Sequence, residues 1–145
     1  MSAMSDYLEN KIVDHIFRNR AYAVPATIYV ALFTAAPSDS GGGTEVTGGA
    51  YARVLVGPSD TAWAATQGGT PASASSGTGG LTDNGSVITF ATPTANWGSI
   101  THMGIFDALT AGNLLLWGAL TTAKTVNNGD PAPTFAAGAL DVTFA

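Results

Sequence analysis

The sequence contains two histidines, His15 and His102, which are the side chains best suited to acid–base chemistry near neutral pH. His15 lies beside apolar residues in a predicted helix, where we expect a helix-surface or interface histidine. His102 lies inside a predicted strand, where we expect a structural or ring-stacking role. Ser99 and Asp107 are its neighbours in sequence, but residues along one strand alternate between faces, so this spacing does not assemble a catalytic triad. With no G-x-S-x-G motif either, we expect that the chain is not an enzyme.

Glycine-rich and aspartate-rich segments are the next candidates, for phosphate and for metal. The segment 41–44 is not followed by Lys-Ser/Thr or by a predicted helix, so it does not match a phosphate-binding loop. Segments 83–85 and 127–130 lack the spaced acids and terminal Glu of a calcium loop, and we expect turns there, with a stray surface cation as the alternative. The chain has no cysteine, which excludes a thiolate nucleophile and a cysteine-ligated metal. We expect no cofactor and no metal site.

The aromatic residues leave carbohydrate recognition open as an alternative. Trp63, Trp97 and Trp117 could form a flat platform for a sugar ring. Trp117 lies in a predicted strand and is expected in the core, whereas Trp97 is expected to cover a sheet edge. Paired-carboxylate catalysis has little basis, because most of the acids are aspartates, which are typical of caps and turns.

The composition predicts an unusually neutral surface. Only 10% of the 145 residues are charged, against about 25% in average soluble proteins, and the formal net charge is -5. An acidic chain with 5 basic residues is a poor partner for a phosphate backbone, so we expect no nucleic acid. We also expect no membrane, because no apolar run reaches the ~18 residues of a span and the first residues lack the pattern of a secretory signal. A surface of this kind suits a chain that lies against other protein subunits.

Residues 5–19 are predicted to form an amphipathic helix. Ser5 is a suitable N-cap, and apolar residues at helical spacing form a stripe along one side. The stripe consists of Leu8, Ile12, Val13, Ile16 and Phe17. No second helix is predicted to cover it, so we expect these residues to form an interface, either with a partner or with other copies of the chain. The alternative is that the helix plugs one end of its own β body.

The rest of the chain has the pattern of an all-β protein. Runs of β-branched and aromatic residues bounded by turn residues predict strands at 27–34, 51–56, 86–92, 98–106, 113–120 and 139–145. Residues 107–112 are predicted to close a hairpin and residues 61–80 to form a long loop. The expected core includes Ile28, Val30, Leu32, Val54, Ile88, Phe90, Ile105 and Leu115.

Short connections without strand–helix alternation predict an antiparallel β-sandwich of jelly-roll type, preceded by one N-terminal amphipathic α-helix. The chain then divides into an N-terminal helix or arm, residues 1–22, and a β-sandwich domain, residues 23–145.

Two blocks of sequence are distinctive. The first runs over residues 26–54 and contains Phe33, Pro37 and a Gly-x-Tyr-x-Arg motif that ends at Arg53. The second contains Trp97-Gly98 and a His-x-Gly-Ile-Phe-Asp motif that begins at His102. Together they resemble a family of small tailed-bacteriophage virion proteins that carry the labels capsid decoration (cement) or tail-fibre-like. The resemblance implies a structural role and no reaction.

From this resemblance we expect a cement protein that binds the major capsid protein and stabilises the head shell. The alternative is a tail-fibre-like or head-surface protein that binds a host receptor or glycan. Decoration is favoured because the chain has no heptad stretch and no repeat from which to build a fibre shaft. We further expect a homotrimer, located in the virion and assembled in the host cytoplasm. A charge on the helix stripe, as in Phe17→Asp or Ile16→Asp, should then impair assembly more than folding.

Overall fold

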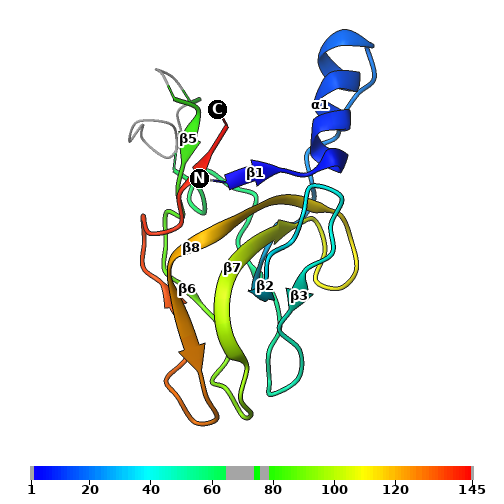
Figure 1. Ribbon diagram of the computed structural model, residues 1–145. Coiled ribbons are helices and arrows are strands. Elements are labelled where there is room, and N and C mark those ends of the chain that lie inside the picture. The colour runs from blue at the N-terminus through cyan, green and yellow to red at the C-terminus, as the bar shows by residue number, and fades with distance from the viewer. Residues whose placement is uncertain (1, 65–73, 76–78, 145) are drawn as a thin grey trace.

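The computed structural model describes residues 2–64, 74–75 and 79–144 of the chain (Figure 1). One helix and a set of mostly short strands follow one another in this order: β1 (Ser2–Met4), α1 (Asp6–Phe17), β2 (Tyr29–Ala35), β3 (Thr44–Glu45), β4 (Val54–Leu55), β5 (Leu81–Thr82), β6 (Ile88–Thr89), β7 (Gly98–Phe106), β8 (Leu114–Val126), β9 (Thr134–Phe135) and β10 (Val142–Thr143). Part of the predicted loop 61–80 lies outside the described residues, as does Ala145 at the end of the last predicted strand.

The main sheet is six-stranded and antiparallel, with the order β1-β8-β7-β2-β3 and with β4 also paired to β2. The long strands β7 and β8 form the predicted hairpin. Asp107 fixes its turn, because its carboxylate accepts hydrogen bonds from the backbone and side-chain N–H groups of Asn113, both at 2.7 Å. Gly112 has a φ of 73°, and a Cβ there would lie 2.6 Å from the Asp107 carboxylate, so the turn requires glycine.

Two two-stranded antiparallel sheets, β5 with β10 and β6 with β9, complete the fold. The prediction of an antiparallel all-β protein with a single N-terminal helix is therefore confirmed for the described part of the chain. The strand order does not confirm the jelly-roll connections, because the second layer consists of these short ribbons and not of a second continuous sheet.

The core lies mainly on one face of the main sheet. Six of the eight expected core residues are buried: Val30, Leu32, Ile88, Phe90, Ile105 and Leu115. Ile28 and Val54 are partly buried and pack against the same cluster. The opposite face carries a smaller cluster around Phe33, Phe106 and Leu114. Gly104 makes this second cluster possible, because a Cβ there would lie 2.9 Å from the Phe33 ring.

The structure differs from the sequence-based expectations at two tryptophans. Trp97, expected over a sheet edge, is 5% exposed and belongs to the core, where its ring meets Tyr51 edge-on. Trp117, expected in the core, is only partly buried on the opposite face. The reason is strand phase: Trp117 pairs with Gly104, whose neighbours Met103 and Ile105 face the main core, so Trp117 faces away from it.

Candidate functional site

The helix α1 is the predicted interface, and its first turn is fixed to the sheet. Ser5 is 2% exposed, and its hydroxyl donates to the Leu114 carbonyl and accepts from the Leu8 N–H, as expected of the N-cap. The backbone N–H of Ser5 donates to the Leu115 carbonyl at 3.0 Å, and that of Asp6 to the Asp39 carbonyl at 2.8 Å. These bonds hold the start of the helix against β8 and a neighbouring loop.

The far end of the helix stands away from the sheet (Figure 1). Exposure rises along the predicted stripe, from 7% at Leu8 to 47% at Val13, 63% at Ile16 and 79% at Phe17. Ile12, between these, is partly buried and packs against the main core. The stripe is therefore divided: its first residue belongs to the core, and its last three present apolar side chains to solvent.

The end of the helix is also well defined. Asn19 has a φ of 54°, and the N–H groups of Arg18 and Arg20 both donate to the Asp14 carbonyl, so the chain turns back there. The side chain of His15 accepts from the Tyr22 N–H at 3.3 Å and so holds the returning segment. His15 is thus the helix-surface histidine that its position predicts.

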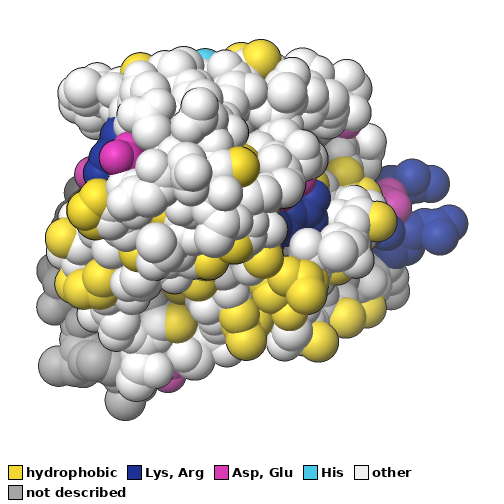
Figure 2. Space-filling view, turned by 90° about the horizontal axis from the view of Figure 1, so that it is seen from below, with side chains coloured by type: hydrophobic (Ala, Val, Ile, Leu, Met, Phe, Trp, Pro, Cys, Tyr) yellow, Lys and Arg dark blue, Asp and Glu magenta, His cyan; other side chains and the backbone are white. Residues whose placement is uncertain are grey.

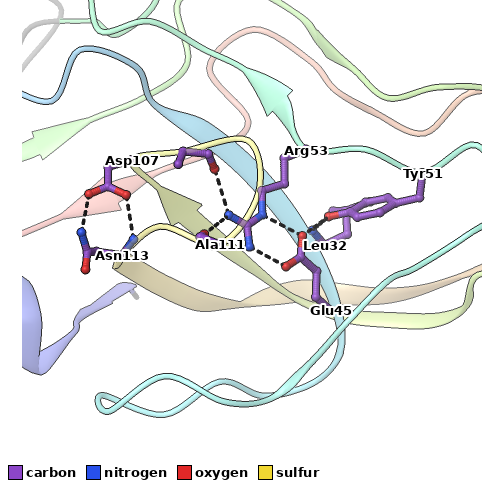
Figure 3. A network of polar contacts seen from close by, with 8 residues as sticks. Leu32, Glu45, Tyr51, Arg53, Asp107, Ala111 and Asn113 are labelled. Atoms are coloured by element: carbon purple, nitrogen blue, oxygen red, sulfur yellow. Dashed lines mark hydrogen bonds and ion pairs between the residues drawn. The ribbon is translucent and has the colours of Figure 1, made fainter.

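A second constellation, the Arg53 cluster, consists of Glu45, Tyr51 and Arg53. The strands β3 and β4 both pair with the same edge of β2, β3 near its end and β4 near its start. The segment between β3 and β4 moves away from β2, which leaves a gap in the pairing along this edge. Over this gap the Leu32 N–H donates to the Tyr51 hydroxyl at 2.9 Å, in place of a backbone acceptor (Figure 3). The Tyr51 hydroxyl in turn donates to Glu45 at 3.0 Å. A side chain thus supplies the hydrogen bond that the interrupted strand does not.

The guanidinium group of Arg53 completes this cluster by bonding in two directions. Its guanidinium donates to the two carboxylate oxygens of Glu45 at 2.9 and 2.7 Å, a forked ion pair whose arginine side chain is 8% exposed. The same group donates to the carbonyls of Ala108 and Ala111 at 2.9 and 2.8 Å (Figure 3). It therefore joins the interrupted edge of the sheet to the turn of the β7–β8 hairpin.

The protonation of Tyr51 indicates that the Arg53 cluster has a structural role. Burial raises the pKa of the Tyr51 hydroxyl, and the negative charge of Glu45 adds to this, while the hydrogen bond from Leu32 opposes it. A neutral tyrosine that both donates and accepts does not supply a nucleophile or a base at physiological pH. The hydrogen bonds described for the cluster all join groups of the protein itself.

The other residues considered for chemistry are also occupied structurally. The Nδ1 atom of His102 is 2.8 Å from the Thr101 hydroxyl, and its ring lies beside that of Trp117, with centroids 6.2 Å apart and planes tilted by 45°. This arrangement agrees with the predicted structural role, although the two rings are not stacked. The Asp107 carboxylate holds the hairpin turn through Asn113, whereas the His102 ring is bonded to Thr101, so neither bond belongs to the hypothetical triad. The described residues include no group of three or more His, Cys, Asp or Glu side chains placed to hold a metal ion.

The tryptophan N–H groups all point to the protein's own acceptors. Trp63 donates to the Val56 carbonyl at 2.6 Å, Trp97 to the Gly49 carbonyl at 2.9 Å and Trp117 to the Asp39 carboxylate at 3.2 Å. Because Trp97 is buried, it does not form part of a surface platform for a sugar.

Asn84 is the residue whose importance the sequence conceals. The sequence predicts a turn at residues 83–85, and in the structure Asn84 is fully buried there, with four hydrogen bonds to its amide. The amide nitrogen donates to the carbonyls of Ser86 and Ala136, and the amide oxygen accepts from the N–H groups of Ala139 and Leu140. Asn84 thereby fixes the segment that leads into the C-terminal strand. An Asn-Gly pair signals a turn, and nothing local indicates burial.

Residues 3–143 match the profile of a protein family described as podophage GP4 fiber I protein gp80. The match covers nearly the whole chain, including the helix, the Arg53 cluster and the β7–β8 hairpin. The chain belongs to this family. As a member of the gp80 fiber family it is a structural protein of a bacteriophage virion. No curated protein matches the sequence.

Membership of the gp80 fiber family agrees with the phage virion resemblance and with the predicted location in the virion. It also gives a setting for the two sequence blocks that carry the resemblance. In the structure the Tyr-x-Arg motif of the first block is bonded to the hairpin turn of the second, so both blocks belong to one structural unit. No described helix of this family member is long and apolar enough to cross a membrane.

Proposed function

We propose that this protein is a structural subunit of the phage fiber, and that it is held in the particle through the exposed part of α1. The family match carries the fiber assignment, because it spans residues 3–143. The geometry of α1 supports the attachment. The N-terminal end of the helix is hydrogen-bonded to β8, whereas the side chains of Val13, Ile16 and Phe17 are exposed to solvent.

The low charge on the surface of the β body also supports the proposal. Figure 2 shows one face on which uncharged atoms dominate and few charged side chains are visible. Only 10% of all residues are charged, so few groups would lose hydration when the subunit packs against other protein. The charged Arg53 cluster is directed inward and stiffens the body.

The sequence-based expectation of a head cement protein bound to the major capsid protein stays a prediction. That the protein is not an enzyme also stays a prediction. A fiber subunit and a cement protein would both be many-copy structural parts with a rigid β body. They differ in where the protein sits on the particle, and this difference can be measured directly.

The test is to locate the protein on intact virions. A phage that carries an epitope at residue 129, in an exposed turn with open space around it, would be labelled with gold-conjugated antibody and imaged. We expect label on the tail or its fibers. Label distributed over the head shell would overturn the fiber proposal in favour of the cement prediction.

The attachment through α1 needs a separate measurement. Phages that carry Phe17→Asp should contain little of the protein, whereas those that carry the control Val87→Asp should contain normal amounts. Val87 is 60% exposed but lies outside the helix. Normal incorporation of Phe17→Asp would contradict attachment through the helix while leaving the location unaffected.

A further inference from the structure

The sequence contains two Asn-Gly pairs, Asn84-Gly85 and Asn128-Gly129. Such a pair is prone to spontaneous deamidation, because glycine has no side chain to keep its backbone nitrogen away from the asparagine amide. Both pairs lie in turns, but Asn84 is fully buried, whereas Asn128 is exposed. The fold therefore gives two sites of the same local chemistry very different surroundings.

The reaction needs no reagent other than water. The Gly85 backbone nitrogen gives up its proton to solvent and bonds to the Cγ atom of Asn84. The Cγ–Nδ2 bond breaks, and the amide nitrogen takes up a proton and leaves as ammonia. Water then opens the resulting succinimide ring on either side, which leaves aspartate or isoaspartate at residue 84. Isoaspartate carries the main chain through its Cβ atom, so the backbone gains a methylene group.

The folded protein opposes the first step of this reaction at Asn84. The amide is bonded at both its nitrogen and its oxygen, so its Cγ atom is not free to turn toward the Gly85 nitrogen. The Gly85 N–H donates to the Ala62 carbonyl at 2.8 Å, which opposes loss of its proton. A Cβ atom on Gly85 would lie 2.6 Å from the Thr61 carbonyl oxygen, so the backbone also has little room to move.

Asn128-Gly129 is the natural reference for this protection. The Gly129 N–H is also bonded, to the Pro93 carbonyl at 2.9 Å, but a Cβ atom on Gly129 would meet nothing within 4 Å. Within the described part of the chain, the side-chain amide of Asn128 has no hydrogen-bond partner. The two pairs therefore differ mainly in the burial and fixing of the asparagine amide.

The contacts that fix Asn84 come largely from one short stretch, residues 136–140. This stretch supplies three of the four amide bonds, and its Gly138 N–H donates to the Asn84 backbone carbonyl at 2.7 Å. Residues 136–139 are exposed, and Leu140 supplies the buried side chain of the stretch. A stretch with so few buried contacts opens more easily than the main sheet unfolds.

We propose that Asn84 is a latent deamidation site, and that residues 136–140 are the cover whose opening exposes it to reaction. While the cover is closed, the amide is fixed and shielded from water. Once the cover opens, the reaction leaves a carboxylate at residue 84, which cannot restore the two bonds that the amide nitrogen donates. A reversible local opening is thereby converted into a permanent change.

Peptide mapping by mass spectrometry tests the protection. The full chain is incubated at mildly alkaline pH, natively and in urea, and deamidation is followed at both asparagines. In urea Asn84 and Asn128 should react at similar rates. In the native protein Asn84 should react at least about tenfold more slowly than in urea, and more slowly than Asn128. An Asn84 rate that folding leaves unchanged, or that equals that of Asn128 in the native protein, would overturn the proposal.

Two matched variants test the cover. Leu140→Ala removes the buried side chain of the cover and should raise the native Asn84 rate about tenfold, with the Asn128 rate unchanged. Leu115→Ala removes an equally buried leucine from β8 and should raise the Asn84 rate far less. An equal rise in both variants would assign the protection to the whole fold and overturn the role of the cover.

Circular dichroism establishes that each variant is folded before its rates are compared. If Leu115→Ala does not fold, Val46→Ala takes its place, because it is a smaller change at a site in the main core that is also 4% exposed. The same outcomes then apply: a selective rise in Leu140→Ala supports the cover, and an equal rise overturns it.

Discussion

The guanidinium carbon of Arg53 lies 3.5 Å from the centre of the Phe106 ring. The positive charge therefore rests on an aromatic face while its N–H groups reach Glu45 and the hairpin turn. Phe106 in turn stacks on Phe33, with ring centroids 6.2 Å apart. One side chain thus links the interrupted sheet edge, the hairpin and the smaller apolar cluster.

Replacing Arg53 by lysine should destabilise the protein even though the charge is kept. Lysine cannot make the forked pair with Glu45 together with the bonds to the hairpin carbonyls, and a buried charge left incompletely paired is costly. We expect a loss of about 2–4 kcal/mol in the free energy of unfolding, measured by urea denaturation. Arg18→Lys is the control: this side chain is 60% exposed, and its change should stay within about 0.5 kcal/mol. Equal losses at the two sites would contradict the role given to Arg53.

Replacing Tyr51 by phenylalanine should lower stability at neutral pH by about 1–3 kcal/mol, because the Leu32 N–H loses its acceptor and Glu45 loses a donor. Urea denaturation at neutral pH measures this loss. Tyr7→Phe, which removes the hydroxyl of a tyrosine at the helix, is the matched control. A neutral-pH stability of Tyr51→Phe equal to that of the native protein would show that the hydroxyl does not bridge the strand gap.

Tyr51 also predicts a dependence on alkaline pH. Burial holds its pKa above the ordinary 10.0, so above that pH the unfolded state releases a proton that the folded state keeps. Stability should therefore be fully present below pH 10 and fall as the pH rises beyond it. Urea denaturation up to about pH 11 should show this slope in the native protein and a shallower one in Tyr51→Phe. An unchanged slope would assign the effect to other groups.

Changing Asn84 to aspartate keeps the shape of the side chain but removes its two donors. The carbonyls of Ser86 and Ala136 would then face a carboxyl oxygen inside the protein. We expect a loss of about 2–4 kcal/mol and earlier proteolysis in the segment between β9 and β10. Asn128→Asp, in an exposed turn, is the control and should have little effect. Thermal unfolding of the two variants side by side checks the difference.

Introducing a charge at either end of the helix stripe distinguishes its buried part from its exposed part by the effect on stability. Leu8→Asp would bury a carboxylate in the main core and should lower the melting temperature sharply. Phe17→Asp changes a side chain that is 79% exposed, so the melting temperature should stay nearly the same. Differential scanning calorimetry gives both values. A large loss for Phe17→Asp would revive the alternative that the whole helix plugs its own β body.

The parts of the fold that local patterns encode could be predicted from the sequence. Ser5 as N-cap, the long strands β2 and β7, and the hairpin turn at 107–112 all follow from residue spacing within a few positions of one another. The strands of two or three residues could not be delimited in this way. β1 is made by Ser2–Met4 pairing with β8 more than a hundred residues away, and so short a strand has no period to recognise.

The features of the candidate site also divide into those that local sequence patterns encode and those that depend on distant contacts. The sequence by itself determined that one helix carries an apolar stripe and that the chain is poor in charge. Tertiary structure alone decided that Leu8 is buried while Phe17 is exposed, that Trp97 and not Trp117 enters the core, and that Arg53 meets the hairpin turn. Each of these depends on contacts between segments far apart in the chain, and a helix or strand pattern specifies which residues share a face but not what that face meets.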